Sequence, residues 1–317
     1  MNVSAPAALK GIVARSRAMR ELLPLVARLA EARSPVLVEG ESGTGKDLVA
    51  HWLHYGGPRR EGPFIKVHCP SIPAELLESE LFGHERGAFT DAHHAKAGKI
   101  EMAAGGTGYF DQIQDLTPAM QAKLLRVVEE RRFERVGGTR TIEVDVRFVV
   151  SSNVDLAEAV RTGRFREDLF HRLNVVPLRL PPLRDRREDI LSLAESFLER
   201  EVERGVTAAT GFATDAEDLL RGYLWPGNVR ELRSIVERAA LLTAEGEVAA
   251  TALPSHVLEQ PATLWAGRER RPTLKDVELA YIRYVLDAVK GNQTRAAGVL
   301  GISRKALWEK RRRYGIS

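Results

Sequence analysis

The sequence predicts an α/β fold, in which helices cover a mainly parallel sheet, followed by an all-α lid and a C-terminal helix-turn-helix. Strand-like and helix-like segments alternate through residues 8–175, whereas 180–253 carries only helical patterns. Residues 253–273 combine proline and mixed charge without periodicity, as is typical of a linker. We therefore expect an α/β subdomain over 1–178, a helical lid over 179–252, a linker over 253–273 and a helix-turn-helix over 274–317.

The elements of the α/β part follow from local patterns. Short apolar runs bounded by glycine, proline or polar residues indicate strands at 34–40, 63–69, 106–113 and 144–153. A helix is expected from Gly45 to residue 56, and apolar residues at helical spacing predict another over 120–133.

Composition and charge narrow the class of protein. Of the 317 residues, 44% are hydrophobic and 28% charged, which is ordinary for a globular protein, and no apolar run is long enough to span a bilayer. The N-terminus has no signal-peptide core, so we expect a cytoplasmic protein without membrane partners. The single cysteine, Cys69, excludes an internal disulfide. From Trp265 to Ser317 there are 13 Lys and Arg against 5 Asp and Glu, which favours a nucleic-acid-binding module over a merely solvated basic helix.

A glycine-rich loop lies between the first strand and its helix. The segment "GESGTGKD" fits the phosphate-binding pattern G-x-x-x-x-G-K in the strand–loop–helix context that the pattern requires. Glycine lets backbone N–H groups surround phosphate oxygens, and the lysine reaches the outer phosphates. The predicted nucleotide-binding residues are Gly40, Glu41, Ser42, Gly43, Thr44, Gly45, Lys46 and Asp47. Asp111 ends the third strand, where such folds place the acid on the magnesium side, so we expect ATP with Mg²⁺.

Several long motifs together resemble one family, the AAA+ activators of sigma-54 RNA polymerase. The matching stretches, in family order, are "GESGTGKD", "ELLESELFGHERGAFTDA", "GGTGYFDQI", "QAKLLRVVEERRFERVGG", "RFREDLFHRLNVVPLRLPPLRDRREDI" and "WPGNVRELRSIVERA". The resemblance implies that Asn153 is a sensor near the γ-phosphate and that Arg230 is the lid arginine on the nucleotide. It also implies that Arg166 and Arg172 are arginine fingers for a neighbouring subunit's site, and hence a ring, usually a hexamer.

Two departures from the family pattern concern the sigma-54 contact loop and the catalytic residues. The family's sigma-54 contact loop is GAFTGA, and here Asp91 replaces the second glycine; a left-handed backbone would still suit aspartate, but its charge and bulk should weaken sigma contact. The family's catalytic glutamate is Gln112, which cannot accept a proton, and its partner asparagine is His68. Either the switch is rewired and hydrolysis weak, or His68 itself activates water. Gly108 also replaces a bulky apolar residue of the family. The contact loop comprises Gly87, Ala88, Phe89, Thr90, Asp91 and Ala92.

The basic tail is expected to form three helices. Its stretch "GNQTRAAGVLGIS" resembles the Fis-type helix-turn-helix that closes these activators, so DNA at an upstream activator site is the expected partner. Ser303 is placed to cap the last helix. The expected buried seam comprises Ala297, Leu300, Ile302, Leu307 and Trp308, and the expected DNA-binding residues are Thr294, Arg295, Ser303, Arg304, Lys305, Lys310 and Arg311.

Two functions remain open from the sequence. The chain is either a working, slow ATPase that remodels sigma-54 polymerase holoenzyme, or a DNA-binding regulator that uses nucleotide for assembly alone. In the second case it acts independently of sigma-54 or as the passive subunit of a mixed ring. Residues 1–10 alone precede the family-like region, so we expect its input to come from a partner protein, expression level or another subunit.

Overall fold

The computed structural model describes residues 13–258, 273–288 and 293–314. The chain divides into two compact units, Met1–Arg200 with Trp225–Glu237, and Glu201–Leu224 with Arg238–Ser317. No helix among the described residues is long and apolar enough to cross a membrane.

The first unit is built on a parallel sheet of five strands in the order β2-β5-β8-β1-β9. The strands are β1 (Val36–Glu39), β2 (Phe64–His68), β5 (Thr107–Asp111), β8 (Arg147–Ser152) and β9 (Pro177–Arg179). The first four confirm the expected strands, and β9 is an addition at the sheet edge. Because the strands are parallel, their carboxyl ends share one edge, where His68 lies opposite Asp111 in register.

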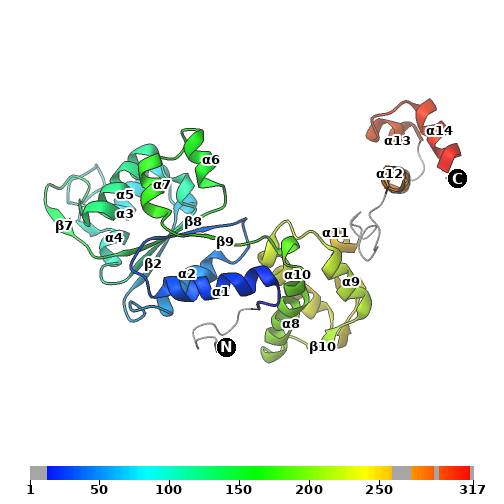
Figure 1. Ribbon diagram of the computed structural model, residues 1–317, viewed down its shortest axis with the longest axis horizontal. Coiled ribbons are helices and arrows are strands. Elements are labelled where there is room, and N and C mark those ends of the chain that lie inside the picture. The colour runs from blue at the N-terminus through cyan, green and yellow to red at the C-terminus, as the bar shows by residue number, and fades with distance from the viewer. Residues whose placement is uncertain (1–12, 259–272, 289–292, 315–317) are drawn as a thin grey trace. The chain divides into compact units, whose positions relative to one another are not determined.

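Helices cover both faces of this sheet (Figure 1). One face carries α1 (Arg17–Ala30) and α2 (Lys46–Tyr55); the other carries α3 (Ala74–Phe82), α4 (Lys99–Met102), α5 (Pro118–Glu130), α6 (Leu156–Arg161) and α7 (Glu167–Leu173). Successive strand residues alternate between the two cores: Tyr109 packs with the α1–α2 side and Phe110 with the other. Both cores are continuous apolar clusters, so the strand ends are held on a rigid support.

A buried arginine ties the α1–α2 layer to the sheet. The Arg147 guanidinium donates to the carbonyl oxygens of Leu53, at 2.6 Å, and of Ala30, at 2.9 Å, and also to that of Leu29. These carbonyls lie in the last turns of α2 and α1, where the carbonyl groups lack i+4 partners inside the helix. The Leu29 carbonyl also accepts from the N–H of Ala32 at 3.1 Å. Burial lowers the pKa of Arg147 to about 10. The guanidinium therefore serves as a shared C-terminal cap for both helices.

The space beside Gly108 in β5 is filled by the side chain of Phe110. A Cβ atom at this position would lie 3.1 Å from Cε2 of Phe110 and 3.3 Å from Cγ1 of Val146. The space of the bulky residue expected at 108 is thus occupied by the Phe110 ring from two residues along the same strand.

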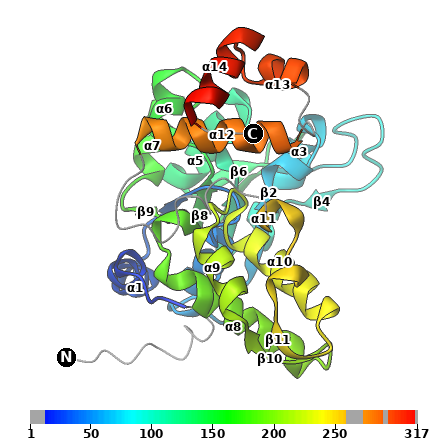
Figure 2. The same ribbon diagram turned by 90° about the vertical axis from the view of Figure 1, so that its right-hand side faces the viewer.

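The helix expected over 120–133 is α5, which begins at Pro118 and ends at Glu130, before the predicted end. It ends at Glu130 because Arg131 adopts a left-handed backbone with φ 56°, and the chain continues as β6 (Arg132–Glu134), paired with β7 (Thr141–Glu143). A second small ribbon pairs β3 (Gly83–His84) with β4 (Lys96–Ala97), and Figure 2 shows the segment between them as a long loop leaving the sheet. Among the described residues, the short 3₁₀ turns are Cys69–Ser71, Ile113–Asp115, Leu183–Asp185 and Ala250–Ala252.

The lid is helical, as expected, and contains in addition a two-stranded parallel ribbon. Its helices are α8 (Glu188–Glu203), α9 (Thr214–Gly222), α10 (Asn228–Leu242) and α11 (Ser255–Leu258), and its strands are β10 (Ala208–Phe212) and β11 (Glu245–Val248). Helix α11 occupies the start of the expected linker, and residues 259–272 lie outside the described part.

The C-terminal region contains α12 (Leu274–Ala288), α13 (Gln293–Val299) and α14 (Arg304–Tyr314). Its core joins Ile282, Val285 and Leu286 of α12 to the seam residues Ala297 and Leu307. Gly301, with φ 66°, forms the turn, and the hydroxyl of Ser303 accepts a hydrogen bond from the N–H of Ala306 at 3.1 Å, as an N-cap does. Trp308 was expected in the seam, and this was wrong: its side chain is 53% exposed, because the neighbouring Leu307 takes the inward position.

Candidate functional site

The glycine-rich loop follows β1 and leads into α2. Gly40, Gly43 and Gly45 have φ of 155°, 79° and 107°, conformations that side chains with a Cβ rarely adopt. A Cβ on Gly43 would lie 2.3 Å from the carbonyl oxygen of Gly227, which immediately precedes α10. The loop can therefore fold close to its own helix and to α10 only because these positions lack side chains.

Lys46, the first residue of α2, closes the loop on itself. Its ammonium donates to the carbonyl oxygens of Gly40 at 2.6 Å and Glu41 at 2.9 Å, and the latter also accepts from the Thr44 hydroxyl at 2.8 Å. Burial lowers the pKa of Lys46. A phosphate group at the loop would offer this partly desolvated ammonium an anionic acceptor in place of two neutral carbonyls.

Glu41 links the glycine-rich loop to the 3₁₀ turn Leu183–Asp185 and to the start of α10. Its carboxylate accepts two hydrogen bonds from Arg184, at 2.6 and 2.8 Å, and one from the Asn228 amide at 3.2 Å. The hydrogen bonds from Arg184, followed by that from Asn228, hold the pKa of Glu41 at about 2. Asn228 also donates to the Ser42 carbonyl at 3.0 Å, so the same amide binds two loop residues.

Arg230 of α10 lies over the loop. Its Nη1 donates to the Ser42 hydroxyl at 3.0 Å, and its backbone N–H to the carbonyl of Gly43 at 3.3 Å. Together the loop, the strand ends and the helices α2, α8 and α10 line a cleft of about 540 Å³. The lining residues are Ser42, Gly43, Gly45, Lys46, Asp47, Leu48, His68, Asp111, Gln112, Asn153, Leu193, Phe197, Arg200, Val229, Arg230 and Arg233.

Two carboxylates, those of Asp47 and Asp111, line this cleft close to each other. The Tyr109 hydroxyl lies 2.8 Å from Oδ1 of Asp47 and 3.3 Å from Oδ1 of Asp111. Lys66 lies between them, with Nζ 2.7 Å from Oδ2 of Asp47 and 3.9 Å from Oδ2 of Asp111. Burial opposes the charge of Asp47, yet the hydrogen bonds from Lys66 and Tyr109 outweigh it and lower the pKa of this carboxyl. Two carboxylates beside a phosphate loop fit Mg²⁺, which binds through one or two carboxylates plus phosphate oxygens.

Gln112 and His68 do not form the pair that the family pattern has at these positions. His68 Nδ1 lies 2.9 Å from Oδ2 of Asp111, the residue opposite it in register. Gln112 has a left-handed backbone with φ 59°, and its Oε1 accepts from the Asn153 amide at 3.3 Å. Asn153 in turn accepts from Gln114 at 2.8 Å. Each partner of the expected pair is therefore engaged elsewhere.

The two candidate finger arginines lie outside the cleft. Arg166 forms two hydrogen bonds with Asp168, at 2.6 and 3.0 Å, and Arg172 lies 3.4 Å from Glu129. Both guanidinium groups are about half exposed. Neither lines the cleft of its own chain, which is what a role toward another subunit requires.

Three protein families match consecutive parts of the chain. The sigma-54 interaction domain matches residues 12–179, the AAA+ ATPase lid domain matches 184–268, and the Fis family of bacterial regulatory proteins matches 273–314. The chain belongs to the sigma-54-dependent transcriptional activators. It accordingly combines a nucleotide-binding AAA+ domain, a helical lid and a Fis-type DNA-binding domain.

Named relatives support this family membership. Regulatory protein AtoC of Escherichia coli K12 is 45% identical, over 96% of this chain and 68% of AtoC. Transcriptional regulatory protein ZraR of Klebsiella oxytoca is 46% identical, over 96% of this chain and 69% of ZraR. The crystal structure of NtrX from Brucella abortus in complex with ATP superposes with a TM-score of 0.74 at 36% identity, over 96% of this chain and 70% of NtrX.

In this sigma-54 activator one residue of the expected contact loop, Gly87, has a left-handed backbone. Gly87 has φ 83°, whereas Asp91 is absent from the described non-glycine residues with positive φ. The tolerance of aspartate for a left-handed backbone is therefore not called upon at position 91, and the charge and bulk of Asp91 are what distinguish it from glycine. Phe89 packs edge-on against His84, with ring centroids 4.9 Å apart.

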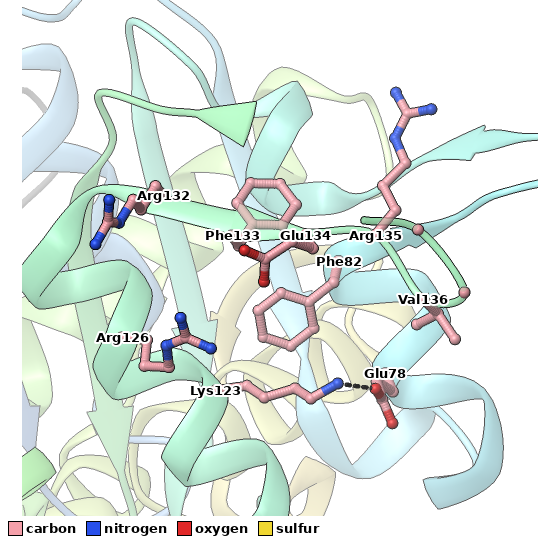
Figure 3. A pocket seen from close by; sticks show the side chains of 11 residues that line it. Glu78, Phe82, Lys123, Arg126, Arg132, Phe133, Glu134, Arg135 and Val136 are labelled. Atoms are coloured by element: carbon pink, nitrogen blue, oxygen red, sulfur yellow. Dashed lines mark hydrogen bonds and ion pairs between the residues drawn. The ribbon is translucent and has the colours of Figure 1, made fainter. Parts of the chain in front are cut away.

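The loop is supported from the β6–β7 ribbon. Gly137, with φ 74°, approaches so closely that a Cβ there would lie 2.7 Å from Cβ of Ala88. At the base of the ribbon, Figure 3 shows Phe82 and Phe133 together, with Lys123 pairing with Glu78, in a hollow of about 300 Å³. The two rings meet edge to face, 5.9 Å apart. This packing joins the ribbon to α3, the helix that leads into the contact loop.

The expected DNA-binding residues of the activator mostly face solvent. Exposed side chains among them are Thr294, Arg295, Ser303, Arg304 and Lys305. Lys310 instead pairs with Glu278 of α12, and Arg311 is half-buried. Lys310 therefore links α14 to α12 within the domain.

Sequence reasoning did not identify three residues of the nucleotide site. Arg184 and Asn228 hold Glu41, and Lys66 holds the two acids. The sequence offered one signal, for Lys66. Lys66 and His68 are two residues apart on a strand, so their side chains lie on the same face of the sheet as that of Asp111, which is opposite His68.

Proposed function

We propose that this sigma-54-dependent activator binds ATP in the cleft and hydrolyses it slowly, so that nucleotide serves mainly to assemble the ring. The observation that carries the proposal is the side chain at the catalytic position, Gln112. Its amide cannot accept a proton at neutral pH, and its oxygen already accepts from Asn153 at 3.3 Å. Loss of a general base typically slows a reaction by about 10²–10⁴-fold.

ATP binding would use groups that already converge. The loop N–H groups and Lys46 would hold the phosphates, and Arg230, next to Ser42, would approach the nucleotide from α10. Asp111, with Asp47 beside it, would hold Mg²⁺, which neutralises phosphate charge when bound. Lys66 keeps these two carboxylates near each other and would shift as the ion enters. Asn153 would sense the γ-phosphate through its position next to Gln112.

The exposed arginines support the proposal of ring assembly. Arg166 and Arg172 pair only with acids beside them in the described part of their own chain. Exchanging such exposed pairs for a neighbour's phosphates costs little, because surface ion pairs contribute only about 0–1 kcal/mol. A ring of identical subunits, of which a hexamer is the expected form, would place them at the next site.

A turnover assay tests the proposal. Gln112→Glu should raise steady-state ATP turnover by about 100-fold or more, the gain expected from a restored general base. Gln293→Glu makes the same chemical exchange at an exposed residue of α13, outside the cleft, and should leave turnover at the wild-type level. Affinity for a fluorescent ATP analogue should change little in either variant. Wild-type turnover equal to that of Gln112→Glu would refute the impaired-site proposal.

A second candidate is a regulator that does not engage sigma-54, or a passive subunit of a mixed ring. It is favoured by Asp91, an exposed charge in the contact loop. Open-complex formation by sigma-54 polymerase should then require Asp91→Gly together with Gln112→Glu. Open complexes formed with Asp91 in place, and Gln112→Glu alone, would exclude this candidate.

A further inference from the structure

The last helix of the DNA-binding domain presents a large aromatic side chain to solvent. Trp308 is 53% exposed, although Leu307 beside it is 1% exposed in the core of the domain. The other described side chains that turn outward on α14 are polar: Arg304, Lys305, Glu309, Arg312 and Arg313. An exposed tryptophan among these charges is an energetic cost to the free protein, and burial in a complex would recover it.

Helical spacing places this side chain in a defined row. Arg304, Trp308 and Arg312 are four residues apart, so they follow one another along one face of α14. The Arg312 guanidinium lies over the indole, 5.6 Å from its ring. The cation–π contact restricts the indole and leaves it flanked by two positive charges, one on each side.

The start of this helix is fixed. The Ser303 hydroxyl caps it, and the turn before it is closed by a hydrogen bond from the Ile302 N–H to the Ala297 carbonyl at 3.1 Å. In a helix-turn-helix, the first turns of the second helix enter the major groove. Trp308 lies in the second turn of α14, within the part that would reach base edges.

The charge around Trp308 identifies the occupant of this face. Arg304, Lys305, Arg312 and Arg313 form an exposed cationic surface that suits DNA phosphates and would repel a second copy of itself. In the major groove, the apolar group that projects from base pairs is the thymine C5-methyl, and apolar side chains recognise it.

We propose that Trp308 is a base-reading residue, whose indole packs on a thymine methyl group in the major groove while Arg312 holds the ring and contacts phosphate. The inference rests on the DNA-binding function of the Fis-type domain. It assigns to the target site a T·A pair at one fixed position, next to the base pairs that Arg304 and Lys305 meet.

The test uses the full chain and duplexes selected from random DNA by the wild-type protein. Each thymine of the selected site is replaced in turn by deoxyuridine, which lacks only the methyl group, and affinity is measured by fluorescence anisotropy. One replacement should weaken wild-type binding by about fourfold, the factor for one buried methyl group. The same replacement should not affect Trp308→Ala.

Trp308→Ala itself should bind the selected duplex about tenfold more weakly, while the slope of affinity against salt stays unchanged, because no phosphate contact is lost. Trp308→Phe should restore part of the affinity. Val299→Ala, which removes another exposed apolar side chain of the domain, should bind as the wild type does.

The outcomes distinguish a failure of specific DNA binding from a failure of the thymine contact alone. If the wild-type chain selects no sequence, its specific DNA binding fails, and the inference with it. If it selects a site but no single deoxyuridine matters, or the loss is equal in Trp308→Ala, only the inference is overturned. A change in oligomeric state of Trp308→Ala without DNA would also overturn it, since the indole would then cover a protein surface.

Discussion

Substitution of Gly43 tests how tightly the phosphate loop and α10 depend on each other. In Gly43→Ala, the new methyl group would lie 2.3 Å from the Gly227 carbonyl oxygen and 3.2 Å from Cβ of Arg230. The first distance is about 1 Å shorter than a favourable contact. The residue must also hold φ 79°, which costs an L-residue about 1–2 kcal/mol. Forced overlap typically adds about 1–3 kcal/mol.

Gly163 provides the matched control. It has φ 70° and nothing within 4 Å of an added Cβ, so Gly163→Ala carries the backbone cost without the overlap. The excess destabilisation of Gly43→Ala should therefore be about 1–3 kcal/mol, or roughly 5 °C more in Tm for a unit of this size. The overlap is relieved by separating α10 from the loop, which removes Arg230 from Ser42.

Two measurements check this prediction. Thermal unfolding by circular dichroism gives the difference in Tm, and titration with a fluorescent ATP analogue gives the affinity. Affinity should fall about tenfold in Gly43→Ala and stay near the wild-type value in Gly163→Ala. Equal Tm values for the two variants, with equal affinities, would refute the steric reasoning.

Three further predictions concern other contacts. The pKa of Glu41 is lowered to about 2 from 4.5, so its pairing stabilises the fold above pH 4.5, and this contribution is lost as pH falls toward 2. In Arg184→Met the free energy of unfolding should therefore depend less on pH between 4.5 and 2. The difference should be about 1 kcal/mol or less, because the pair is partly exposed. Arg147→Met should lower the free energy of unfolding in urea by about 3–5 kcal/mol, since buried helix carbonyls lose their donor, whereas loss of under 1 kcal/mol would contradict its capping role. Ser303→Ala should cost the DNA-binding domain about 1 kcal/mol, seen as a lower melting temperature and weaker DNA binding with ATP affinity intact.

The sequence predicted those parts of the fold in which local pattern and motif agree. The first four strands of the sheet, the phosphate loop and the Ser303 cap each depend on residues within a few positions of one another. The family resemblance added what local pattern cannot supply, namely the order of the domains along the chain.

Features set by tertiary contacts were missed for identifiable reasons. Strand β9 begins with a proline and lies at the sheet edge, so it carries little strand signal. Phe133 continues the helical spacing of α5, and only the backbone turn at Arg131 ends the helix. Leu307 and Trp308 are adjacent apolar residues, and spacing alone could not decide which of them faces the core.

The partners of polar side chains were the least predictable part of the site. The family pattern pairs the residues at positions 112 and 68. In this chain Gln112 instead accepts a hydrogen bond from Asn153, which follows the neighbouring strand β8, while His68 contacts Asp111 across the β2–β5 register. Such choices depend on side chains from strands that are far apart in sequence, for which periodicity carries no information.

The close packing of Phe110 against Gly108 limits how the sequence of this strand can change during evolution. Because the Phe110 ring fills the space beside Gly108, the side-chain volumes at these two positions are coupled. A methyl group at 108 would meet the ring, and a smaller residue at 110 would leave a void that the glycine cannot fill. Single substitutions at either site should therefore cost more stability than a paired exchange that conserves the total volume. Homologous chains should therefore show covariation between these two positions of the strand.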